Sequence, residues 1–505
     1  MNKSVRLAVV LTMLAVWLAA CGGSTPTYVL GGSISGLGTG KGISLSETVS
    51  GQTVAVVSNG SFAFANKLPK GASYKVEIAI NPAAQGCVIE DGAGTIGDGD
   101  VLGVKVTCGN SGTLDGSFGS GGKLVEPLMI PSREINALAM TDAGQILAAG
   151  TYYAGSGPSF DFVALRTDAN GVYDGDFASG GKLQLDFGSD AATDVLALPG
   201  GGAVMAGRSD GDFALLKLTA AGTADASFGS SGLAKVDFDS GSDSAVAVFT
   251  MDDGGFLLVG RAWVGSKTQL GVLRLNAAGQ PLSTFGASGK AAYIAAGWSN
   301  LSIRDAVRTT GGKIVVVGHA NTGSDRDVWL ARLNADGTLD SGFGSGGWTS
   351  FDYDGDDQYA RGIAAQADGK LVIAARNYDS GDYQLLVART NADGTLDASF
   401  DGDGLAFGSF GGEYDDYGAI AVQADGKIVV AGRKGISGSD DLLALARYQS
   451  DGSLDASFGD GGMAVFDLGL SETTYANDLL IQPDGRILVG GSKLGDALLL
   501  VRVWQ

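Results

Sequence analysis

Two short acid-rich loops are the clearest candidates for chemistry in this chain of 505 residues. They read FDYDGDD and GGEYDDY, and their acids are Asp352, Asp354, Asp356, Asp357, Glu413, Asp415 and Asp416. Closely spaced carboxylates around a glycine are suited to Ca²⁺, but the first loop lacks the register and the terminal Glu of an EF-hand. We therefore expect solvated acidic loops and no cofactor, with calcium at Asp352, Asp354, Asp356 and Asp357 as the alternative.

Pairs of carboxylates also serve as catalysts in glycosidases, provided that their separation suits an acid and a base. The acids that could take this role are Asp354, Asp357, Asp415 and Asp416. Their separation does not follow from the sequence, so no pair is selected. Metal clusters and nucleophilic catalysis find less support, because His319 is the only histidine and each of the three cysteines has another expected role. An enzyme acting on polysaccharide or peptide is therefore the alternative hypothesis.

Aromatic and charged side chains recur in loops that differ in length and content along the chain. Flat rings beside carboxylates and arginines suit a sugar or peptide ligand. The candidate ligand residues are Tyr152, Tyr153, Trp263, Trp298, His319, Tyr353, Tyr359, Arg376, Tyr378, Tyr414, Tyr417 and Arg433. The first hypothesis is therefore a binding module for protein or glycan, and a scaffold within an envelope complex is a third possibility.

A regularly spaced set of basic residues has a structural interpretation instead. Its members are Arg166, Lys217, Arg274, Arg332, Arg389, Arg447 and Arg502. An Asp follows eight residues after each of the first six except Arg274, which is followed by Leu282. A fixed offset is typical of a structural ion pair or a turn cap. Arg502 has no downstream acid and Asp115 has no upstream base, so we predict that Asp115 lies beside Arg502 and that the ends of the repeat region meet there.

These residues are positioned by an internal repeat whose clearest copy is QADGKIVVAG at Gln423–Gly432. The turn glycines are Gly144, Gly201, Gly254, Gly311, Gly369, Gly426 and Gly485, which gives repeats of roughly 51 to 59 residues. Each repeat holds four apolar runs, at Leu405–Phe407, Ala419–Gln423, Lys427–Gly432 and Leu442–Tyr448 in the sixth copy. Runs that are apolar throughout indicate strands buried on both faces.

Seven such repeats predict an all-β chain with a seven-bladed β-propeller. The alternative, a β-solenoid, needs polar capping ends, whereas the last strand here is apolar. In an up-and-down order, the first-to-second and third-to-fourth connections share one face. That face varies between repeats, so we expect ligand specificity there. The second repeat departs most, with PGGG at 199–202 in place of the usual turn, and predicts a loosely packed blade.

The repeat also resembles a known family. The pattern GTLDASFG…QADGKIVVAG…DLLALAR, seen at Gly394–Gly402, Gln423–Gly432 and Asp441–Arg447, is similar to the delta-60 repeats of bacterial β-propellers. The likeness spans residues 109–505. It implies a propeller fold and little about function.

The N-terminus predicts export and a lipid anchor. Lys3 and Arg6 precede an apolar stretch too short to span a bilayer. Leu18-Ala19-Ala20-Cys21 resembles a lipoprotein lipobox, which implies a signal peptide at 1–20, acylation of Cys21 and a tether at 21–27. Gly22 implies outer-membrane sorting in a Gram-negative host. The net charge of −21 argues against a nucleic-acid partner.

Between the tether and the repeats, residues 28–108 predict a small β-sandwich of immunoglobulin-like or transthyretin-like type. The runs Thr53–Ser58 and Phe62–Ala65 flank Asn59-Gly60, a signal for a β-hairpin. Cys87 and Cys108 are the only cysteines besides Cys21. In an exported protein such a pair predicts a disulfide.

Overall fold

The computed structural model describes residues 25–127, 133–153, 160–321, 323, 325–379, 382–470, 473–493 and 497–505. The predicted signal peptide, Cys21 and residues 22–24 of the predicted tether lie outside these ranges. Regular structure in the described ranges consists of β-strands, in agreement with the all-β prediction. None of these residues forms a helix that is long and apolar enough to cross a membrane.

The chain divides into two compact units. The first comprises residues up to Ile80 together with Ile89–Thr107, and the second comprises Asn81–Val88 and Cys108–Gln505. Two four-stranded sheets, with strand orders β5-β2-β10-β8 and β4-β3-β7-β9, and a two-stranded sheet, β1-β6, precede the repeats. Their strands are β1 (Thr27–Tyr28), β2 (Leu30–Ser35), β3 (Ile43–Glu47), β4 (Gln52–Val56), β5 (Gly60–Ala63), β6 (Leu68–Pro69), β7 (Ser73–Ile80), β8 (Gln85–Glu90), β9 (Ala93–Thr95) and β10 (Val101–Asn110).

The hairpin prediction at Asn59-Gly60 is wrong. Strand β4 ends at Val56 and β5 begins at Gly60, but the two strands belong to different sheets, so the chain crosses between sheets here. The physical reason lies in the side chain of Asn59, which accepts a hydrogen bond from Leu37 N and donates one to Leu37 O, both at 2.9 Å. The amide therefore fastens a neighbouring loop instead of closing a two-strand turn. The predicted disulfide is present between Cys87 and Cys108.

Seven four-stranded antiparallel sheets make up the repeats. The first three comprise β12 (Arg133–Met140), β13 (Ile146–Tyr153), β14 (Phe160–Thr167) and β15 (Lys182–Leu185); β16 (Asp190–Ala197), β17 (Ala203–Ser209), β18 (Asp212–Leu218) and β19 (Leu233–Val236); and β20 (Ser244–Thr250), β21 (Phe256–Val264), β22 (Lys267–Leu275) and β23 (Lys290–Tyr293). The next two comprise β24 (Ser299–Arg308), β25 (Ile314–Asn321), β26 (Arg326–Leu333) and β27 (Trp348–Phe351); and β28 (Asp357–Ala365), β29 (Leu371–Asp379), β30 (Asp382–Thr390) and β31 (Leu405–Gly408). The last two comprise β32 (Asp416–Val422), β33 (Ile428–Lys434), β34 (Leu442–Tyr448) and β35 (Met463–Phe466); and β36 (Thr474–Ile481), β37 (Ile487–Lys493), β38 (Ala497–Val503) and β11 (Lys123–Pro127).

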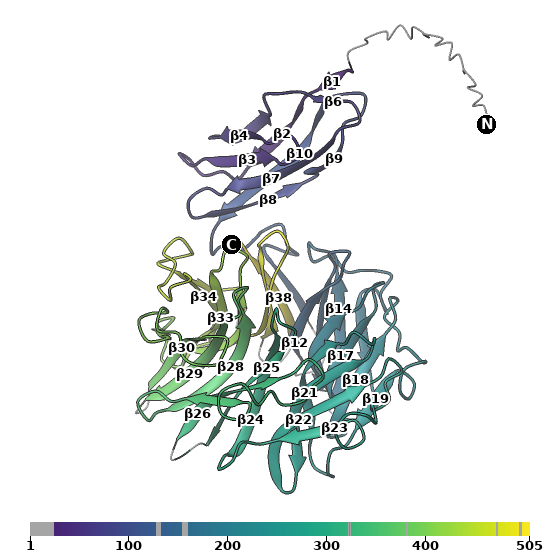
Figure 1. Ribbon diagram of the computed structural model, residues 1–505. Coiled ribbons are helices and arrows are strands. Elements are labelled where there is room, and N and C mark those ends of the chain that lie inside the picture. The colour runs from purple at the N-terminus through teal and green to yellow at the C-terminus, as the bar shows by residue number, and fades with distance from the viewer. Residues whose placement is uncertain are drawn as a thin grey trace, which may run out of the picture. The chain divides into compact units, whose positions relative to one another are not determined.

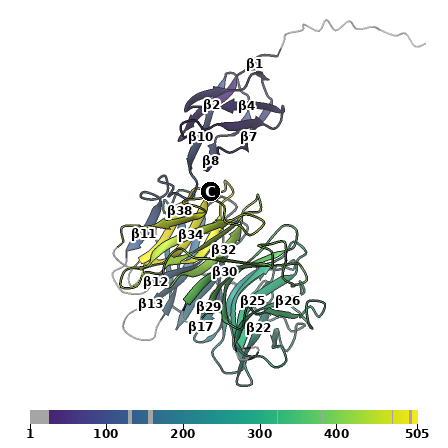
Figure 2. The same ribbon diagram turned by 90° about the vertical axis from the view of Figure 1, so that its left-hand side faces the viewer.

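The grouping of strands differs in one respect from the sequence expectation. The first run of each repeat joins the sheet of the preceding repeat, so β31 pairs with β30 rather than with β32. The glycine-rich connection after each third strand turns the chain straight back onto that strand, which explains the pairing. By the same rule β11, the earliest run, pairs with β38 near the C-terminus (Figure 2). One sheet therefore combines both ends of the repeat region.

Each sheet packs against its two neighbours in sequence (Figure 1). A further hydrophobic cluster joins the last sheet to the first, through Leu488 and Leu498 on one side and Ile135 and Leu138 on the other. The first strands of successive sheets also contact one another, and β36 contacts β12. The succession of sheets is therefore closed. The second repeat is as well packed as the rest, since Met205 and Leu216 are fully buried, so the prediction of a loose blade is wrong.

The repeated turn fixes the first hairpin of each sheet. In the sixth sheet Gln423 N donates to Lys427 O and Gly426 N donates to Gln423 O, while Gly426 has a φ of +85°. Glycine adopts that conformation without steric cost. In the fourth sheet the positive φ belongs to Gly312 and not to Gly311, which corrects the predicted register by one residue.

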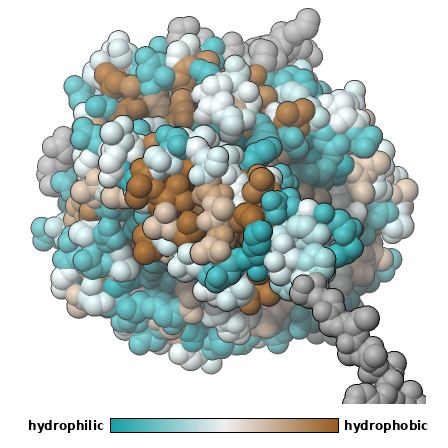
Figure 3. Space-filling model, turned by 90° about the horizontal axis from the view of Figure 1, so that it is seen from above, coloured by the Kyte–Doolittle hydropathy of each residue, from teal (hydrophilic) through white to brown (hydrophobic). Residues whose placement is uncertain are grey.

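On the face seen from above, Figure 3 shows hydrophobic residues gathered near the middle of the view and smaller groups of them among hydrophilic residues elsewhere. In the first compact unit the large exposed apolar side chains are Val49, Val57, Ile80 and Leu102. Singly exposed apolar residues are ordinary on protein surfaces.

Candidate functional site

A β-bulge interrupts the first strand of each of the seven sheets at the same place. The extra residues are Asn136, Thr193, Val246, Arg304, Arg361, Gly418 and Asn477. We call these residues the bulge ring, because all seven line one small cavity of about 160 Å³ between the sheets. A bulge re-aims a side chain that regular pleating would bury. The repeat thereby presents one variable side chain per sheet to a common central space.

The second strands supply another set of equivalent positions. Each lies directly after the apolar run of the repeat, and the residues are Thr151, Arg208, Arg261, His319, Arg376, Arg433 and Ser492. We call this set the second-strand ring. Five of its seven members are arginine or histidine. The ring lies toward the end of the sheets opposite the Asp-Gly turns, on the face where the sequence predicted specificity.

Polar bulge residues bind the neighbouring sheet. Asn136 Nδ2 donates to Ala192 O at 2.8 Å, Thr193 Oγ1 donates to Ala245 O at 2.8 Å, and Asn477 Nδ2 donates to Ile135 O at 2.9 Å. These bonds run from the seventh sheet to the first and on to the second and third. The ring is therefore held by the same contacts that hold the sheets together.

Three half-buried aspartates follow directly after bulge residues, at Asp194, Asp305 and Asp478. Each accepts one backbone N–H from the residue after it and another from the next sheet, as Asp305 does from Ala306 N at 2.7 Å and Ile363 N at 2.9 Å. The equivalent cross-sheet donors are Val248 N to Asp194 and Leu138 N to Asp478. Burial raises the pKa of Asp194 and of Asp478 to about 7 and that of Asp305 to about 6.

Two contiguous cavities of about 470 and 530 Å³ open above the bulge ring. They share Glu134, Asn136, Thr193 and Arg304. The charged residues that line them are Arg208, Arg261, Arg304, Arg361, Arg433, Glu134 and Asp416. We call the two cavities together the mouth. Five arginines and two carboxylates line it, so the mouth is positive although the whole chain carries a net charge of −21. A cleft lined by one sign of charge concentrates ligands of the opposite sign.

The acids and bases of the mouth are unevenly paired. Arg361 forms a two-pronged contact with Asp416, from Nε to Oδ1 at 3.0 Å and from Nη2 to Oδ2 at 2.7 Å, and Arg376 Nη1 reaches the same Oδ2 at 3.3 Å. Arg433 pairs with Asp441. Within the described ranges no carboxylate forms an ion pair with Arg208, Arg261 or Arg304.

The positive charge of the mouth affects the pKa of neighbouring groups. Burial, followed by the positive charges of Arg304 and Arg361, lowers the pKa of His319 to about 3, so this imidazole is neutral at physiological pH. Loss of hydration lowers the pKa of Arg304, and the nearby charge of Arg361 adds to the effect. Burial raises the pKa of Glu134, against a hydrogen bond from Asn136. The mouth is therefore an unfavourable place for further cations.

The predicted ligand residues fall into two groups. Several are occupied in packing: Tyr152 and His319 are buried, Tyr417 donates or accepts a bond of 2.8 Å with the hydroxyl of buried Tyr448, and Trp298 and Tyr353 pack against the hydrophobic clusters between sheets. Tyr153 packs on Phe160, and Tyr359 contacts Asp357 and Arg326. The accessible residues are Trp263, Tyr378 and Tyr414.

Arg376, Tyr378, Tyr383 and Tyr414 form an aromatic cluster beside the mouth. The rings of Tyr378 and Tyr383 lie 4.8 Å apart and those of Tyr383 and Tyr414 lie 6.3 Å apart. The guanidinium of Arg376 lies 4.2 Å from the centre of the Tyr383 ring. Because Arg376 also reaches Asp416, the cluster is joined to the cavity of the mouth.

The acid-rich loops do not assemble a pair of free carboxylates. Asp415 Oδ2 accepts from Phe410 N and Ser409 Oγ while its Oδ1 accepts from Gly435 N, so this acid holds its own loop. Asp357 pairs with Arg326 at 3.0 Å and Asp416 pairs with Arg361. Asp354 is exposed. The arrangement offers hydrogen-bonded loop anchors instead of an acid and a base facing a common space.

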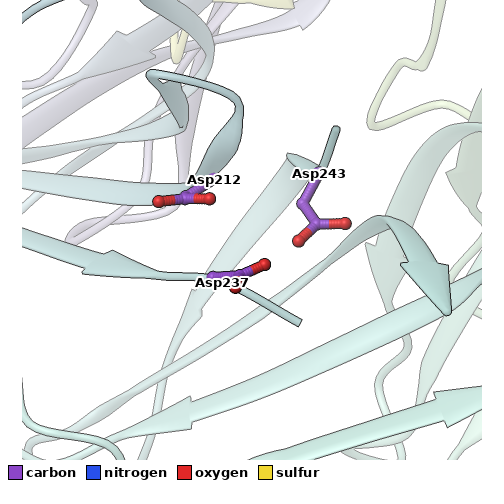
Figure 4. Close-up of side chains that lie close together, drawn as sticks. All are labelled: Asp212, Asp237 and Asp243. Carbon is purple, nitrogen blue, oxygen red and sulfur yellow. The ribbon is translucent and has the colours of Figure 1, made fainter. Parts of the chain in front are cut away.

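The four calcium candidates also point to different partners. Asp352 accepts from Gly355 N, Asp356 accepts from Asn377 Nδ2, and Asp357 faces Arg326. Over the described residues, convergent ligand atoms occur instead at Asp212, Asp237 and Asp243, all within 4.8 Å of one another (Figure 4). Asp243 there accepts from Trp263 N and Phe238 N, which resembles the loop-anchoring role of Asp415.

The regularly spaced bases meet the acids eight positions later. Distances are 2.8 Å for Arg166–Asp174, 3.0 Å for Lys217–Asp225, 2.7 Å for Arg332–Asp340 and Arg389–Asp397, and 2.8 Å for Arg447–Asp455. Arg502 contacts Asp115 at 2.7 Å. Arg274, which faces Leu282, turns instead to Asp253 of the Asp-Gly turn at 2.9 Å.

Arg208, Arg261, Arg304, Arg361 and Glu134 are not among the residues predicted from the sequence. A signal for the arginines of the second strand exists in the sequence, because a basic residue follows the apolar run in several repeats. The half-buried aspartates have a signal too, since Asp194, Asp305 and Asp478 each precede the positive-φ glycine of their turn by seven residues. The bulge residues stand eight positions before the same glycine, but their residue type varies from Asn and Thr to Val, Arg and Gly, so no residue pattern marks them.

Three stretches of the chain, 312–343, 366–400 and 423–458, match a family model described as a domain of unknown function (DUF5122) beta-propeller. These repeats are those of a β-propeller. The matched stretches lie in the fourth to sixth repeats, and the propeller sheets built from them carry His319, Arg361 and Arg376. No curated protein matches the sequence significantly.

Several solved structures resemble the propeller at a distance. YCF48 from Cyanidioschyzon merolae is 12% identical with a TM-score of 0.42, covering 75% of this chain and 99% of its own. Sqt1 from Chaetomium thermophilum is 11% identical with a TM-score of 0.42, covering 75% and 100%. A PL25 ulvan lyase bound to an oligosaccharide is 12% identical with a TM-score of 0.42, covering 75% and 96%. Likenesses this distant do not bear on what this chain binds.

Proposed function

We propose that this protein is a lipoprotein of the bacterial cell envelope whose seven-bladed, delta-60-type propeller binds a glycan without catalysis. In this proposal residues 1–20 are a signal peptide, Cys21 is acylated and begins a tether to residue 27, and residues 28–108 form a small β-sandwich. Residues 109–505 form the propeller. The anchor belongs to the outer membrane, and the closed succession of seven sheets supports the propeller part of the proposal.

The aromatic cluster beside the mouth is the observation that carries the binding role. The side chains of Tyr378 and Tyr414 are 37% and 50% exposed, so their rings are available to a ligand. Tyrosine offers a flat apolar face and a hydroxyl, which together suit the face and edge of a sugar ring. Arg376 and Asp416, directly beside the rings, add hydrogen-bonding groups of both kinds.

A catalytic role receives less support from the same loops. The carboxylate of Asp415 accepts hydrogen bonds from backbone N–H groups of its own loop. Asp357 and Asp416 each form an ion pair with an arginine. A glycosidase needs one carboxylate that holds a proton and a second that is free to act as base or nucleophile. The arrangement favours holding a ligand over transforming it.

Binding is tested with the full chain on an array of bacterial and plant glycans. We expect a ligand whose binding falls at least tenfold in Tyr378→Ala and Tyr414→Ala, because each change removes an accessible ring. Tyr28→Ala, in β1 of the first compact unit, is the matched control and should bind normally. Capture of a protein with no glycan bound, or binding unaffected by both tyrosine changes, would contradict the proposal.

Anchoring is tested separately in a Gram-negative host. Wild-type chain should co-sediment with the outer-membrane fraction and incorporate labelled palmitate. Cys21→Ser should lose the label and leave the membrane fraction, because the thiol is the acylation site. A Cys21→Ser chain that remains membrane-bound and labelled would contradict the anchor.

A further inference from the structure

We propose that the ligand of the propeller carries an acidic group, a carboxylate or sulfate on a saccharide, and that Arg208, Arg261 and Arg304 bind that group. The inference rests on the proposed function, which it narrows from glycans in general to acidic ones. The three arginines come from β17, β21 and the bulge of β24, which belong to three successive sheets. All three line the larger cavity of the mouth.

The absence of carboxylate partners is the first observation behind the inference. Arginines elsewhere in the propeller pair with acids, as at Arg166, Arg389 and Arg447. Arg208, by contrast, is half-buried and Arg261 and Arg304 are exposed, so the three are accessible to a ligand. In the part of the chain that the structure describes, Arg261 has only a hydrogen bond to Ser242 Oγ at 3.0 Å and Arg208 only the ring of Phe160 at 5.6 Å. The side chain of Arg304 has no hydrogen bond to a described residue. Most of the guanidinium donors of the three arginines are therefore available to a ligand.

The surroundings of the arginines favour an anion over a neutral group. Glu134 is the one acid among the described residues that line this cavity. One carboxylate faces three guanidinium groups, so the lining of this cavity is positive. The chain as a whole has 55 acidic and 34 basic residues, whereas three arginines and one acid line this cavity. Guanidinium groups match carboxylate and sulfate oxygens in a planar, two-pronged geometry.

The size and lining of the cavity suit a sugar residue. Its volume of about 530 Å³ lies in the range of small-molecule sites. Hydroxyl-bearing side chains at Thr151, Thr193, Ser244, Thr268 and Ser302 line the same space and can bond ring hydroxyls. The cavity continues into the neighbouring one that contains Asp416, which contacts Arg376 of the aromatic cluster. One oligosaccharide can therefore contact both the cluster and the arginines.

The experiment measures binding of the full chain to three immobilised polymers. Polygalacturonate supplies carboxylates, dextran sulfate supplies sulfates, and dextran is the neutral polymer with the same backbone as the second. We expect binding to at least one acidic polymer and weakening of that binding as salt is raised from about 50 to about 300 mM, because the contact is ionic. Which acidic polymer binds decides between carboxylate and sulfate.

Variants locate the contact. Arg304→Gln and Arg261→Gln, tested separately, should each weaken binding of the acidic polymer at least tenfold. Both side chains line the cavity, so neither change should lower the thermal unfolding midpoint by more than a few degrees. Arg308→Gln is the matched control, since Arg308 lies on the same strand as Arg304 but bonds Thr250 O outside the cavity. It should bind like the wild type.

The outcomes separate this inference from the proposed function. If the array finds a neutral glycan that depends on Tyr378 and Tyr414 while neither acidic polymer binds, the function stands and the inference is overturned. Binding of an acidic polymer that is unchanged in both Arg304→Gln and Arg261→Gln also overturns the inference. If the wild-type chain binds no glycan of any kind, both the proposed function and the inference are overturned.

Discussion

Arg502 and Asp115 lie 387 positions apart in the chain, yet Arg502 Nε donates to Asp115 Oδ2 at 2.7 Å with both side chains almost fully buried. Arg502 Nη2 also donates to Ser117 Oγ at 2.9 Å, and Arg486 Nη1 donates to Asp115 at 2.8 Å. Next to this group, β11 pairs with β38. The start and the end of the propeller are therefore fastened by one buried charge cluster and one strand pairing.

Asp115→Ala should destabilise the propeller strongly, because it leaves the buried guanidinium of Arg502 without its acid and leaves Arg486 with Asp484 alone. Breaking a buried pair by removing one partner costs about 3–5 kcal/mol. We expect the midpoint of urea unfolding, followed by tryptophan fluorescence, to fall accordingly. Asp225→Ala is the matched control: Asp225 holds the same place in the second sheet, but its pair with Lys217 is more exposed. A loss no larger than that of the control would contradict the role of Asp115 in closure.

The third sheet offers a test of the repeated ion pair. Leu282 stands where other sheets have Asp, and its N–H still donates to Arg274 O at 2.8 Å as Asp340 N does to Arg332 O. Arg274 uses Asp253 instead. Asp253→Ala should therefore lower the free energy of unfolding by roughly 1–2 kcal/mol. Adding Leu282→Asp should recover most of that loss, because it places an acid at the usual position. No recovery in the double variant would show that the spacing alone does not define the pair.

The repeat, the strands and the ion pairs could be predicted because each follows from a local pattern that occurs several times. The pairing of Arg502 with Asp115 could be predicted because Arg502 has no acid eight residues later and Asp115 has no base eight residues earlier. The hairpin at Asn59-Gly60 failed because a turn signal does not tell whether the two flanking strands share a sheet. The side chain of Asn59 instead bonds Leu37, 22 residues earlier, a contact that local sequence does not contain.

The candidate site was predicted less well than the fold. The sequence pointed to the correct face and to Arg376, Tyr378 and Tyr414, but it gave Tyr417 and His319 the same weight although both are buried. Arg304 was missed because it occupies a bulge. A strand with one extra residue shifts its alternation at a point that hydrophobic periodicity does not locate.

Gly418→Ala should disturb the bulge ring at a place where the sixth and seventh sheets approach closely. A Cβ at this glycine would lie 1.8 Å from Ala476 O of the seventh sheet, so the backbone must shift. We expect a loss of about 1–3 kcal/mol, as for other overpacked sites, measured by urea unfolding. Gly175→Ala is the matched control, since nothing lies within 4 Å of its added Cβ. A Gly418→Ala chain as stable as this control would contradict the close approach.

The half-buried aspartates beside the bulge ring and the ion-paired aspartates affect the free energy of unfolding in different ranges of pH. Burial raises the pKa of Asp194 and Asp478 to about 7 and that of Asp305 to about 6. Unfolding exposes these acids and returns each pKa to its ordinary value near about 4. Between about pH 4 and 7 the folded state therefore binds more protons, and stability falls as pH rises. Asp340 behaves in the opposite way, because hydrogen bonding by Lys313 and Arg332 lowers its pKa to about 2 and stability is lost below about pH 4.

The thermal midpoint should therefore be highest near about pH 4 to 5 and decline toward about pH 8. Asp305→Asn tests the cause, because an amide cannot ionise and the decline should become shallower. The variant should also be less stable at every pH, since the amide NH₂ that the change introduces would meet a backbone donor, Ala306 N or Ile363 N, where a carboxylate oxygen now accepts. Asp368→Asn, at an exposed turn, is the control and should keep the wild-type slope. A decline as steep in Asp305→Asn as in the control would show that the half-buried aspartate does not cause it.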